Sequence, residues 1–252
     1  NIKANESWQR ALPLESSRGT IYDINHDVLV TNKMMSSVVV VPSQIKDKKQ
    51  CAKLLSECLN CDQKKLEDKL NKQVSVLRLQ PEGRQIDENT AYKIDKLKLP
   101  GVYLVQDTLR YYPYNHYLAH TLGFVGIDNQ GLAGLELKYD QYLSGVNGSI
   151  NYYMNAKSHN LHLYPQVYNS PVTGMDIQLT INKELQDIVE RELDNAYKQY
   201  DPDSILALAM NPNDGSIMAI SSKPDFDPNT IDADWKTITS DEENSCLLTS
   251  TK

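Results

Sequence analysis

The sequence predicts an α+β fold, because helical and strand patterns alternate along most of its 252 residues. Apolar residues at helical spacing predict helices over residues 47–59, 62–70, 87–97 and 183–200. Asp87 and Asn182 are placed to cap the last two of these helices. β-Branched or alternating runs predict strands, in chain order, at residues 37–41, 73–79, 102–105, 149–153, 176–181, 204–210 and 216–220.

Residues 17–30 predict a β-hairpin, since apolar residues lie on both sides of a polar turn at residues 25–27. The acidic residues of this segment imitate the beginning of a calcium-binding loop. Val28 and Met34, however, stand where such a loop needs glycine and glutamate. We therefore expect no calcium here.

Glycines gather in residues 120–148, where they interrupt short apolar pairs. Leu135, Tyr139, Tyr142 and Leu143 recur at helical spacing and predict one helix, which the glycines at 145 and 148 end. A phosphate-binding loop is the alternative, but the G-x-x-x-x-G-K-[ST] motif and a preceding apolar strand are both missing. The glycines are better explained by turns and close backbone contacts.

The amino-acid composition argues against several classes of function. A formal net charge of −7 and a pI near 5.3 argue against nucleic-acid binding, and the 15 tyrosines lack basic neighbours. No run approaches the roughly 18 apolar residues that indicate a membrane span. Of the four cysteines, Cys58 and Cys61 form a lone C-x-x-C with no second half for a zinc site. We expect free thiols, or a Cys58–Cys61 disulfide in an oxidising compartment, and neither a metal nor a cofactor.

Three consecutive motifs from Arg110 to Gly148 resemble a known signature. They read R-x-Y-P, A-H-x-x-G-F-x-G and G-x-x-G-L-E-x-x-Y-D-x-x-L-x-G-x-x-G. This string is similar to the pedestal (dimerisation) domain of class B penicillin-binding proteins. The hairpin resembles that family's first motif, although Ile24 and His26 replace its usual arginine and glycine. The structural motif residues carried over are Arg18, Gly19, Asp23, Arg110, Pro113, His120, Gly123, Gly126, Gly134, Glu136, Tyr139, Gly145 and Gly148.

The resemblance implies a domain plan. Residues 1–172 would form an elongated pedestal, with a small α/β lobe inserted at about residues 43–107. Residues 173–252 would be the incomplete beginning of a transpeptidase domain, because motifs up to residue 229 resemble the first motifs of that domain. The chain begins with Asn1, so the resemblance also implies a preceding single membrane anchor, with this chain on the extracytoplasmic face. In a sporulating cell the membrane would be that of the forespore.

The motifs of acyl transfer are not found as a set. The family uses S-x-x-K, S-x-N and K-[TS]-G, and the last of these occurs nowhere in the chain. Residues 43–46 fit S-x-x-K, and residues 149–151 and 158–160 fit S-x-N, but matches this short arise by chance. Residues 244–252 only approximate the motifs. We therefore assign no catalytic residue.

The function that the resemblance implies belongs to the longer protein of which this chain would be a part, the parent protein. By resemblance, it would be a penicillin-sensitive D,D-transpeptidase that cross-links peptidoglycan stem peptides through a serine acyl-enzyme, in cell-wall or spore-cortex synthesis. This chain would position the catalytic domain and offer surfaces to a membrane glycosyltransferase. The alternative is a non-catalytic scaffold or binding protein built on the same pedestal. Within the pedestal, we expect Glu136 to pair with Arg18 or Arg110; the competing interpretation is a solvent-exposed carboxylate.

Overall fold

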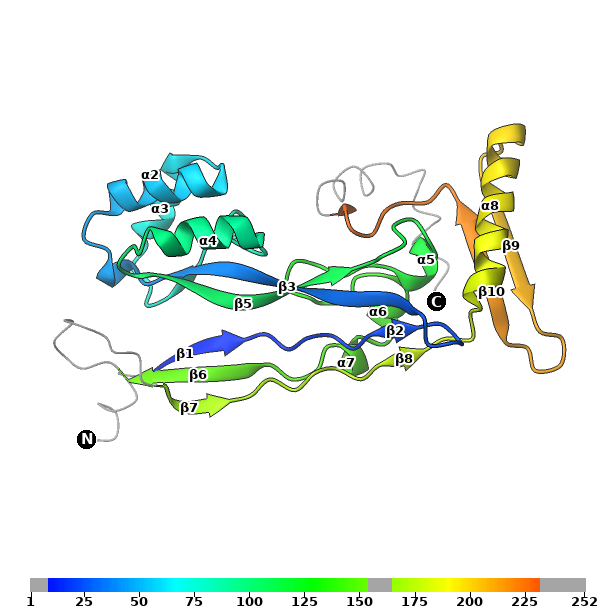
Figure 1. Ribbon diagram of the computed structural model, residues 1–252, viewed down its shortest axis with the longest axis horizontal. Helices are drawn as coiled ribbons and strands as arrows, with labels where there is room; N and C mark the ends of the chain where they lie inside the picture. Colours follow the sequence, from blue (N-terminus) through cyan, green and yellow to red (C-terminus); the bar gives the residue numbers. More distant parts are fainter. Residues whose placement is uncertain (1–8, 154–164, 232–252) are drawn as a thin grey trace. The chain divides into compact units, whose positions relative to one another are not determined.

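A computed structural model describes residues 9–153 and 165–231 of the chain (Figure 1). Contacts between residues divide it into two compact units, each assembled from three stretches. The first unit comprises Asn1–Ser16, Lys33–Leu109 and Val146–Val172; the second comprises Ser17–Asn32, Arg110–Gly145 and Thr173–Lys252. The domain boundary near residue 172 remains a prediction about the parent protein.

Both units mix helices and strands, as the sequence predicts. The helices are η1 (Pro42–Gln44), α2 (Lys48–Leu59), α3 (Gln63–Leu70), α4 (Glu88–Lys96), α5 (Ala119–Leu122), α6 (Gly134–Lys138), α7 (Asp140–Leu143) and α8 (Lys183–Tyr200). The strands are β1 (Gln9–Leu14), β2 (Ile21–Tyr22), β3 (Val28–Val40), β4 (Leu77–Arg78), β5 (Val102–Tyr111), β6 (Gly148–Tyr153), β7 (Pro165–Asn169), β8 (Ile177–Gln178), β9 (Ile205–Met210) and β10 (Ile217–Lys223).

In the first unit, α2, α3 and α4 lie on one side of β3 and β5 (Figure 1). Each helix begins at an aspartate whose carboxylate accepts a hydrogen bond from a backbone N–H in the first turn: Asp47 from Gln50, Asp62 from Lys64 and Asp87 from Thr90. Their apolar faces bury a core with β3 that includes Val38, Val40, Leu55, Leu66, Leu70 and Ile94. The same unit contains the antiparallel sheet β1-β6-β7.

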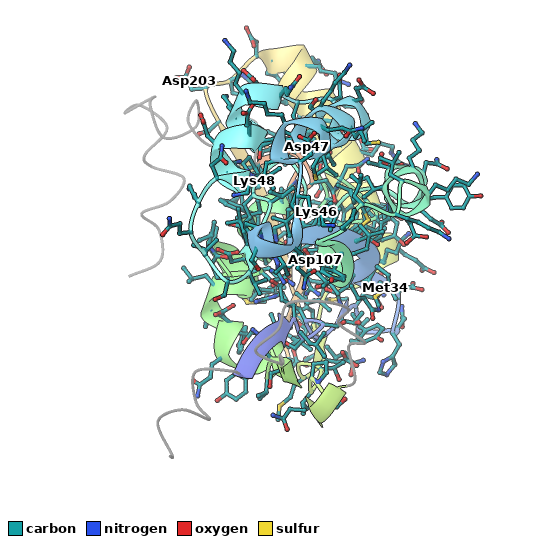
Figure 2. All side chains as sticks on the ribbon, turned by 90° about the vertical axis from the view of Figure 1, so that its left-hand side faces the viewer. Met34, Lys46, Asp47, Lys48, Asp107 and Asp203 are labelled. Atoms are coloured by element: carbon teal, nitrogen blue, oxygen red, sulfur yellow. The ribbon has the colours of Figure 1, made fainter. Side chains whose placement is uncertain are left out.

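A buried ionic cluster lies within the first unit and has no signature in the sequence. Arg84 contacts both Asp107, which is labelled in Figure 2, and Glu15, and Arg78 also pairs with Glu15. The Ser37 hydroxyl donates to Asp107. Burial, and then the neighbouring Asp107, raise the pKa of Glu15. The cluster joins segments that are far apart in the chain.

In the second unit, β2 pairs antiparallel with the first residues of β3 and parallel with β8. The core of this unit gathers apolar residues from the hairpin, from the segment after β5 and from β8 onward, including Ile21, Val30, Tyr112, Leu122, Leu143 and Ile181. Helix α8 packs on the antiparallel pair β9-β10 (Figure 1). The predicted hairpin, helix 183–200 and C-terminal strand pair are therefore confirmed.

Several strands differ in length from the prediction. The patterns at residues 28–30 and 37–41 belong to one continuous strand, β3. The strands predicted over residues 73–79 and 176–181 shrink to two residues each, β4 and β8. The reason for β8 is its partner: β2 itself has two residues before the turn, so β8 has no longer edge along which to pair.

The single helix predicted over residues 134–143 is two short helices. They meet at Tyr139, whose φ of −109° and ψ of 20° interrupt the helical path. Asp140 accepts hydrogen bonds from Arg18 and from the backbone N–H of Gly131, which orients the second helix independently of the first. As a result Leu143 is fully buried, whereas Tyr142 is 53% exposed and does not share the predicted apolar face.

The apolar stripe predicted on α8 is only partly buried. Leu193 lies in the interior, but Ile188 is exposed. Gln186 is fully buried instead, and its side-chain amide bonds both backbone groups of Ile220 in β10, at 2.8 Å from N to Oε1 and 2.7 Å from Nε2 to O. A satisfied polar side chain thus joins α8 to β10 at a position that hydrophobic periodicity does not detect.

Candidate functional site

The centre of the second unit is a buried carboxylate between two arginines. Arg18 Nε donates to one oxygen of Glu136 at 3.0 Å, and Arg110 Nε donates to the other at 2.7 Å. The three side chains are at most 1% exposed. The prediction that Glu136 pairs with one of these arginines is confirmed, and both participate.

The remaining hydrogen bonds of the two guanidinium groups go mainly to backbone oxygens. Arg18 Nη1 donates to Asn129 O and to the Asp140 carboxylate, each at 2.6 Å, and Arg110 Nη1 donates to Gly19 O at 2.7 Å. Two positive and two negative side chains therefore balance. Charges buried in this way stabilise only when they are paired and hydrogen-bonded, which indicates a structural network joining the hairpin to helices α6 and α7.

Glycines let backbones meet around this network. A Cβ on Gly19 would lie 1.8 Å from the carbonyl oxygen of Met175. Gly123 and Gly134 have φ values of 74° and 57°, and each passes close to the backbone around the other. These contacts explain why the motif has glycine at these three positions.

Asp23 lies at the turn of the hairpin and is fully buried. Its Oδ1 accepts from the backbone N–H groups of Asn25 and Asp27 at 2.7 and 2.8 Å, and its Oδ2 accepts from that of Lys183 at 3.2 Å. His26 takes a positive φ of 65°, the conformation that glycine provides in the family motif. Asp23 therefore stabilises the turn and also contacts the first turn of α8.

His120, the second residue of the second motif, contacts β10 and the segment that follows it. Its Nδ1 lies 3.0 Å from Ser222 Oγ in β10, and its ring packs edge-on against Phe226 at 5.0 Å between centroids. Phe124 contacts the same Phe226 ring at 5.9 Å. Burial lowers the pKa of His120, and Nε2 has no hydrogen-bond partner among the described residues.

Asn229 makes a second connection to the motif segment. Its side-chain amide bonds both backbone groups of Tyr112, with Tyr112 N donating to Oδ1 and Nδ2 donating to Tyr112 O, each at 3.0 Å. Two further contacts lie nearby: Leu118 N donates to Glu190, and the Tyr117 hydroxyl donates to the Lys183 carbonyl. Residues 112–124 therefore hold α8, β10 and residues 226–229 in place.

The structure brings some of the motif residues together and separates others. Arg18, Gly19, Arg110 and Glu136 share the buried network, and Tyr139 lies where α6 gives way to α7. Pro113, Gly126 and Gly145 lie in turns and loops of the same unit, and Gly148 begins β6 in the first unit.

Two residues of this site were not singled out from the sequence. Asp140 fills the acidic position that follows Tyr139 in the motif, so its place in the motif could have identified it. Asn229 ends the P-x-F-D-P-N string, but nothing local indicates that it would bond Tyr112.

The serine that matches S-x-x-K does not form a reactive pair in this structure. Ser43 lies exposed in the short helix η1. Lys46, which is labelled in Figure 2, is also exposed and follows beyond the end of that helix. Ser149 lies in β6 opposite Asn169. The matches at residues 158–160 and 244–252 fall outside the described residues. Cys51, Cys58 and Cys61 are free thiols, so the alternative of a Cys58–Cys61 disulfide is not observed.

These features define a class of protein. The family described as Penicillin-binding Protein dimerisation domain matches residues 13–179, and the chain belongs to that family. The resemblance in the three motifs is therefore confirmed. The fold agrees, with helices and strands arranged as in the pedestal and the beginning of the transpeptidase domain of these proteins.

Particular relatives are similar to different degrees. The chain is 43% identical over 235 residues to stage V sporulation protein D of Bacillus subtilis, covering 93% of this chain and 36% of that protein. It is 28% identical to the peptidoglycan D,D-transpeptidase FtsI of Escherichia coli, covering 88% of this chain and 38% of FtsI. The chain thus spans little more than a third of these relatives.

Solved structures show the same fold at low identity. The penicillin-binding protein PBP2 in its complex with MreC from Helicobacter pylori matches with a TM-score of 0.70 and 23% identity, over 95% of this chain and 48% of that one. Penicillin-binding protein 2X of Streptococcus thermophilus matches with a TM-score of 0.61 and 19% identity, over 89% of this chain and 37% of that one. Within residues 9–153 and 165–231, no helix is long and apolar enough to cross a membrane.

The pH dependence of stability is expected to report on His120. Because burial lowers its pKa, the unfolded chain takes up a proton before the folded chain does as the pH falls. The free energy of unfolding should therefore decrease as the pH falls below about 6.5, the ordinary value for histidine. Urea unfolding between about pH 7.5 and pH 5.5 measures this change. The His120→Gln variant should lose less stability over the interval, and equal losses in the two proteins would contradict the assignment.

Proposed function

We propose that this chain is the N-terminal part of a penicillin-binding protein that cross-links peptidoglycan in cell-wall or spore-cortex synthesis. In this proposal residues 1–172 form the pedestal, and residues 173–252 begin a serine-type D,D-transpeptidase domain. The chain itself supplies no catalytic residue. The role of the chain is to hold the beginning of the catalytic domain in a defined position.

The observation that carries the proposal is the pair of hydrogen bonds between Asn229 and the backbone of Tyr112. Tyr112 belongs to the R-x-Y-P motif of the pedestal, whereas Asn229 ends the last motif assigned to the transpeptidase domain. The contact of His120 with Ser222 and Phe226 supports it from a second pair of motifs. A side chain that satisfies both backbone groups of a residue more than a hundred positions away restricts translation and rotation of the segment that carries it.

Partners and location follow from the same proposal. Peptidoglycan stem peptides would be the substrate of the whole protein, and a membrane glycosyltransferase would bind the pedestal. The complex of PBP2 with MreC from Helicobacter pylori is a precedent for a partner protein on this fold. A single N-terminal anchor would hold the protein on the extracytoplasmic face of the membrane. A non-catalytic scaffold remains the second candidate.

The sequence of the gene distinguishes a transpeptidase from a non-catalytic scaffold. If the chain is part of a transpeptidase, the reading frame after Lys252 should encode S-x-x-K, S-x-N and K-T-G in this order. It should not encode a domain of another enzyme class. The protein translated from that frame should be acylated by a fluorescent penicillin at the serine of S-x-x-K, with loss of labelling when that serine becomes alanine. A frame without these motifs would favour the scaffold.

This chain alone is expected not to react with penicillin. Acyl transfer needs a serine beside a lysine that can accept its proton, and Ser43 and Lys46 are both exposed, so water solvates the ammonium group. After incubation with a fluorescent penicillin, the intact mass should equal that of the untreated chain. A penicillin-binding protein with all three motifs serves as the positive control. A stable one-to-one adduct that disappears in Ser43→Ala, or that maps to Ser250, would contradict the prediction.

A further inference from the structure

Two buried polar atoms of the R-x-Y-P motif have no hydrogen-bond partner among the described residues: Arg110 Nη2 and the hydroxyl oxygen of Tyr112. Each of these residues is 3% exposed, so bulk water does not solvate either group. Buried polar atoms of native proteins nearly always have a partner, and an exception calls for an explanation such as a bound water molecule or ion.

The other nitrogens of the Arg110 guanidinium group are all hydrogen-bonded. Nε donates to Glu136 at 2.7 Å, and Nη1 donates to Gly19 O at 2.7 Å and to Asn32 Oδ1 at 3.2 Å. The second oxygen of the Glu136 carboxylate accepts from Arg18. Since a guanidinium nitrogen only donates, Nη2 needs an acceptor that these groups do not supply in this arrangement.

The Tyr112 hydroxyl lies close to the same guanidinium group. Burial, and then the charge of Glu136, raise the pKa of Tyr112, whereas the neighbouring Arg110 lowers it. No hydrogen bond joins Nη2 to the hydroxyl oxygen, although both atoms are buried in the same part of the second unit. A single acceptor atom beside them, at about 3 Å from each, would satisfy both.

We propose that Arg110 Nη2 and the Tyr112 hydroxyl bind a small hydrogen-bond acceptor, either a water molecule or a halide ion. Both protein groups donate to it, which is the recognition chemistry that a lone oxygen or halide requires. A buried water molecule is held by two to four polar partners, and these two groups supply the minimum. Because both side chains are buried, we expect a ligand of one heavy atom.

The bound acceptor gives the tyrosine of R-x-Y-P a role that its apolar ring does not explain. Phenylalanine would fill the same volume, but only tyrosine donates a hydroxyl hydrogen. The backbone of Tyr112 also makes the two hydrogen bonds to Asn229. A ligand that fixes the hydroxyl therefore also fixes the residue to which Asn229 is bonded. This site lies in the second unit and depends neither on acyl transfer nor on the proposed function.

A crystal structure of the whole chain, grown in sodium bromide with data collected at the bromine absorption edge, identifies the ligand. We expect one density peak within hydrogen-bond distance of both Arg110 Nη2 and the Tyr112 hydroxyl oxygen. An anomalous signal at the peak shows a halide, and a peak without that signal shows water; both results support the proposal. If no peak is present and the two atoms bond directly to each other or to other protein atoms, the proposal is overturned.

Tyr112→Phe removes one of the two donors and keeps the apolar ring. In crystals of this variant we expect the density peak to disappear, and in solution we expect the Tm to fall by about 2–4 °C. Tyr92→Phe removes the hydroxyl of a side chain that is 60% exposed, so the Tm should stay within about 1 °C of the unmodified chain. A peak that keeps its position and occupancy in Tyr112→Phe would show that the hydroxyl does not hold the ligand, and would refute the proposal.

Discussion

Replacing Glu136 with alanine is expected to lower the free energy of unfolding by roughly 3–5 kcal/mol. The substitution removes the carboxylate that Arg110 contacts through Nε, and it leaves Arg18 with Asp140, whose side chain is 38% exposed, as its remaining carboxylate partner. Two guanidinium groups then repel each other in the interior, where water cannot screen them. Urea unfolding followed by circular dichroism measures the loss. Glu136→Gln should recover part of it, because the amide oxygen still accepts one hydrogen bond.

A surface carboxylate gives the matched control. Glu192 pairs with Arg191 on α8, and their side chains are 60% and 66% exposed. Glu192→Ala also removes a carboxylate beside an arginine, but its cost should stay below about 1 kcal/mol. If the two alanine variants lost similar amounts of stability, the buried network would not be the stabilising feature that its geometry indicates.

Replacing Gly19 with alanine is expected to cost about 3 kcal/mol or more, the upper end for overpacking. The new Cβ would lie 1.8 Å from Met175 O and 2.4 Å from its carbonyl carbon, and both are backbone atoms that cannot rotate away. The chain must shift, which also strains the hydrogen bonds from Gly19 N to Leu143 O and from Arg110 to Gly19 O. Thermal and urea unfolding should both show the loss.

Gly215 separates this steric effect from the general cost of replacing glycine. It has a φ of 75°, and a Cβ there would meet nothing within 4 Å. Gly215→Ala should therefore cost only about 1–2 kcal/mol, the price of the left-handed backbone for an alanine. An equal or larger loss in Gly215→Ala than in Gly19→Ala would show that the contact with Met175 is not decisive.

Motif spacing identified most of the buried network before any contact was known. Arg18, Arg110 and Glu136 were all recognised as motif residues, and their motif positions led to the prediction that Glu136 pairs with one of the two arginines. The sequence left open which arginine would pair. Both do, because the two oxygens of one carboxylate can accept from two donors, and the fold brings residues 18, 110 and 136 to one point. The separation of these residues along the chain does not predict that they meet in the fold.

Local chemistry explains which elements the sequence determined by itself. The start of α8 depends on Asn182, whose side chain accepts from Leu185 N, and the hairpin turn depends on Asp23 and its own neighbours. These contacts lie within a few residues of the chain, so a pattern can encode them. The lengths of β4 and β8, the break at Tyr139 and the bonds from Asn229 to Tyr112 were decided only by the tertiary structure. Each depends on a partner far away in the chain, and a strand or helix extends only as far as that partner allows.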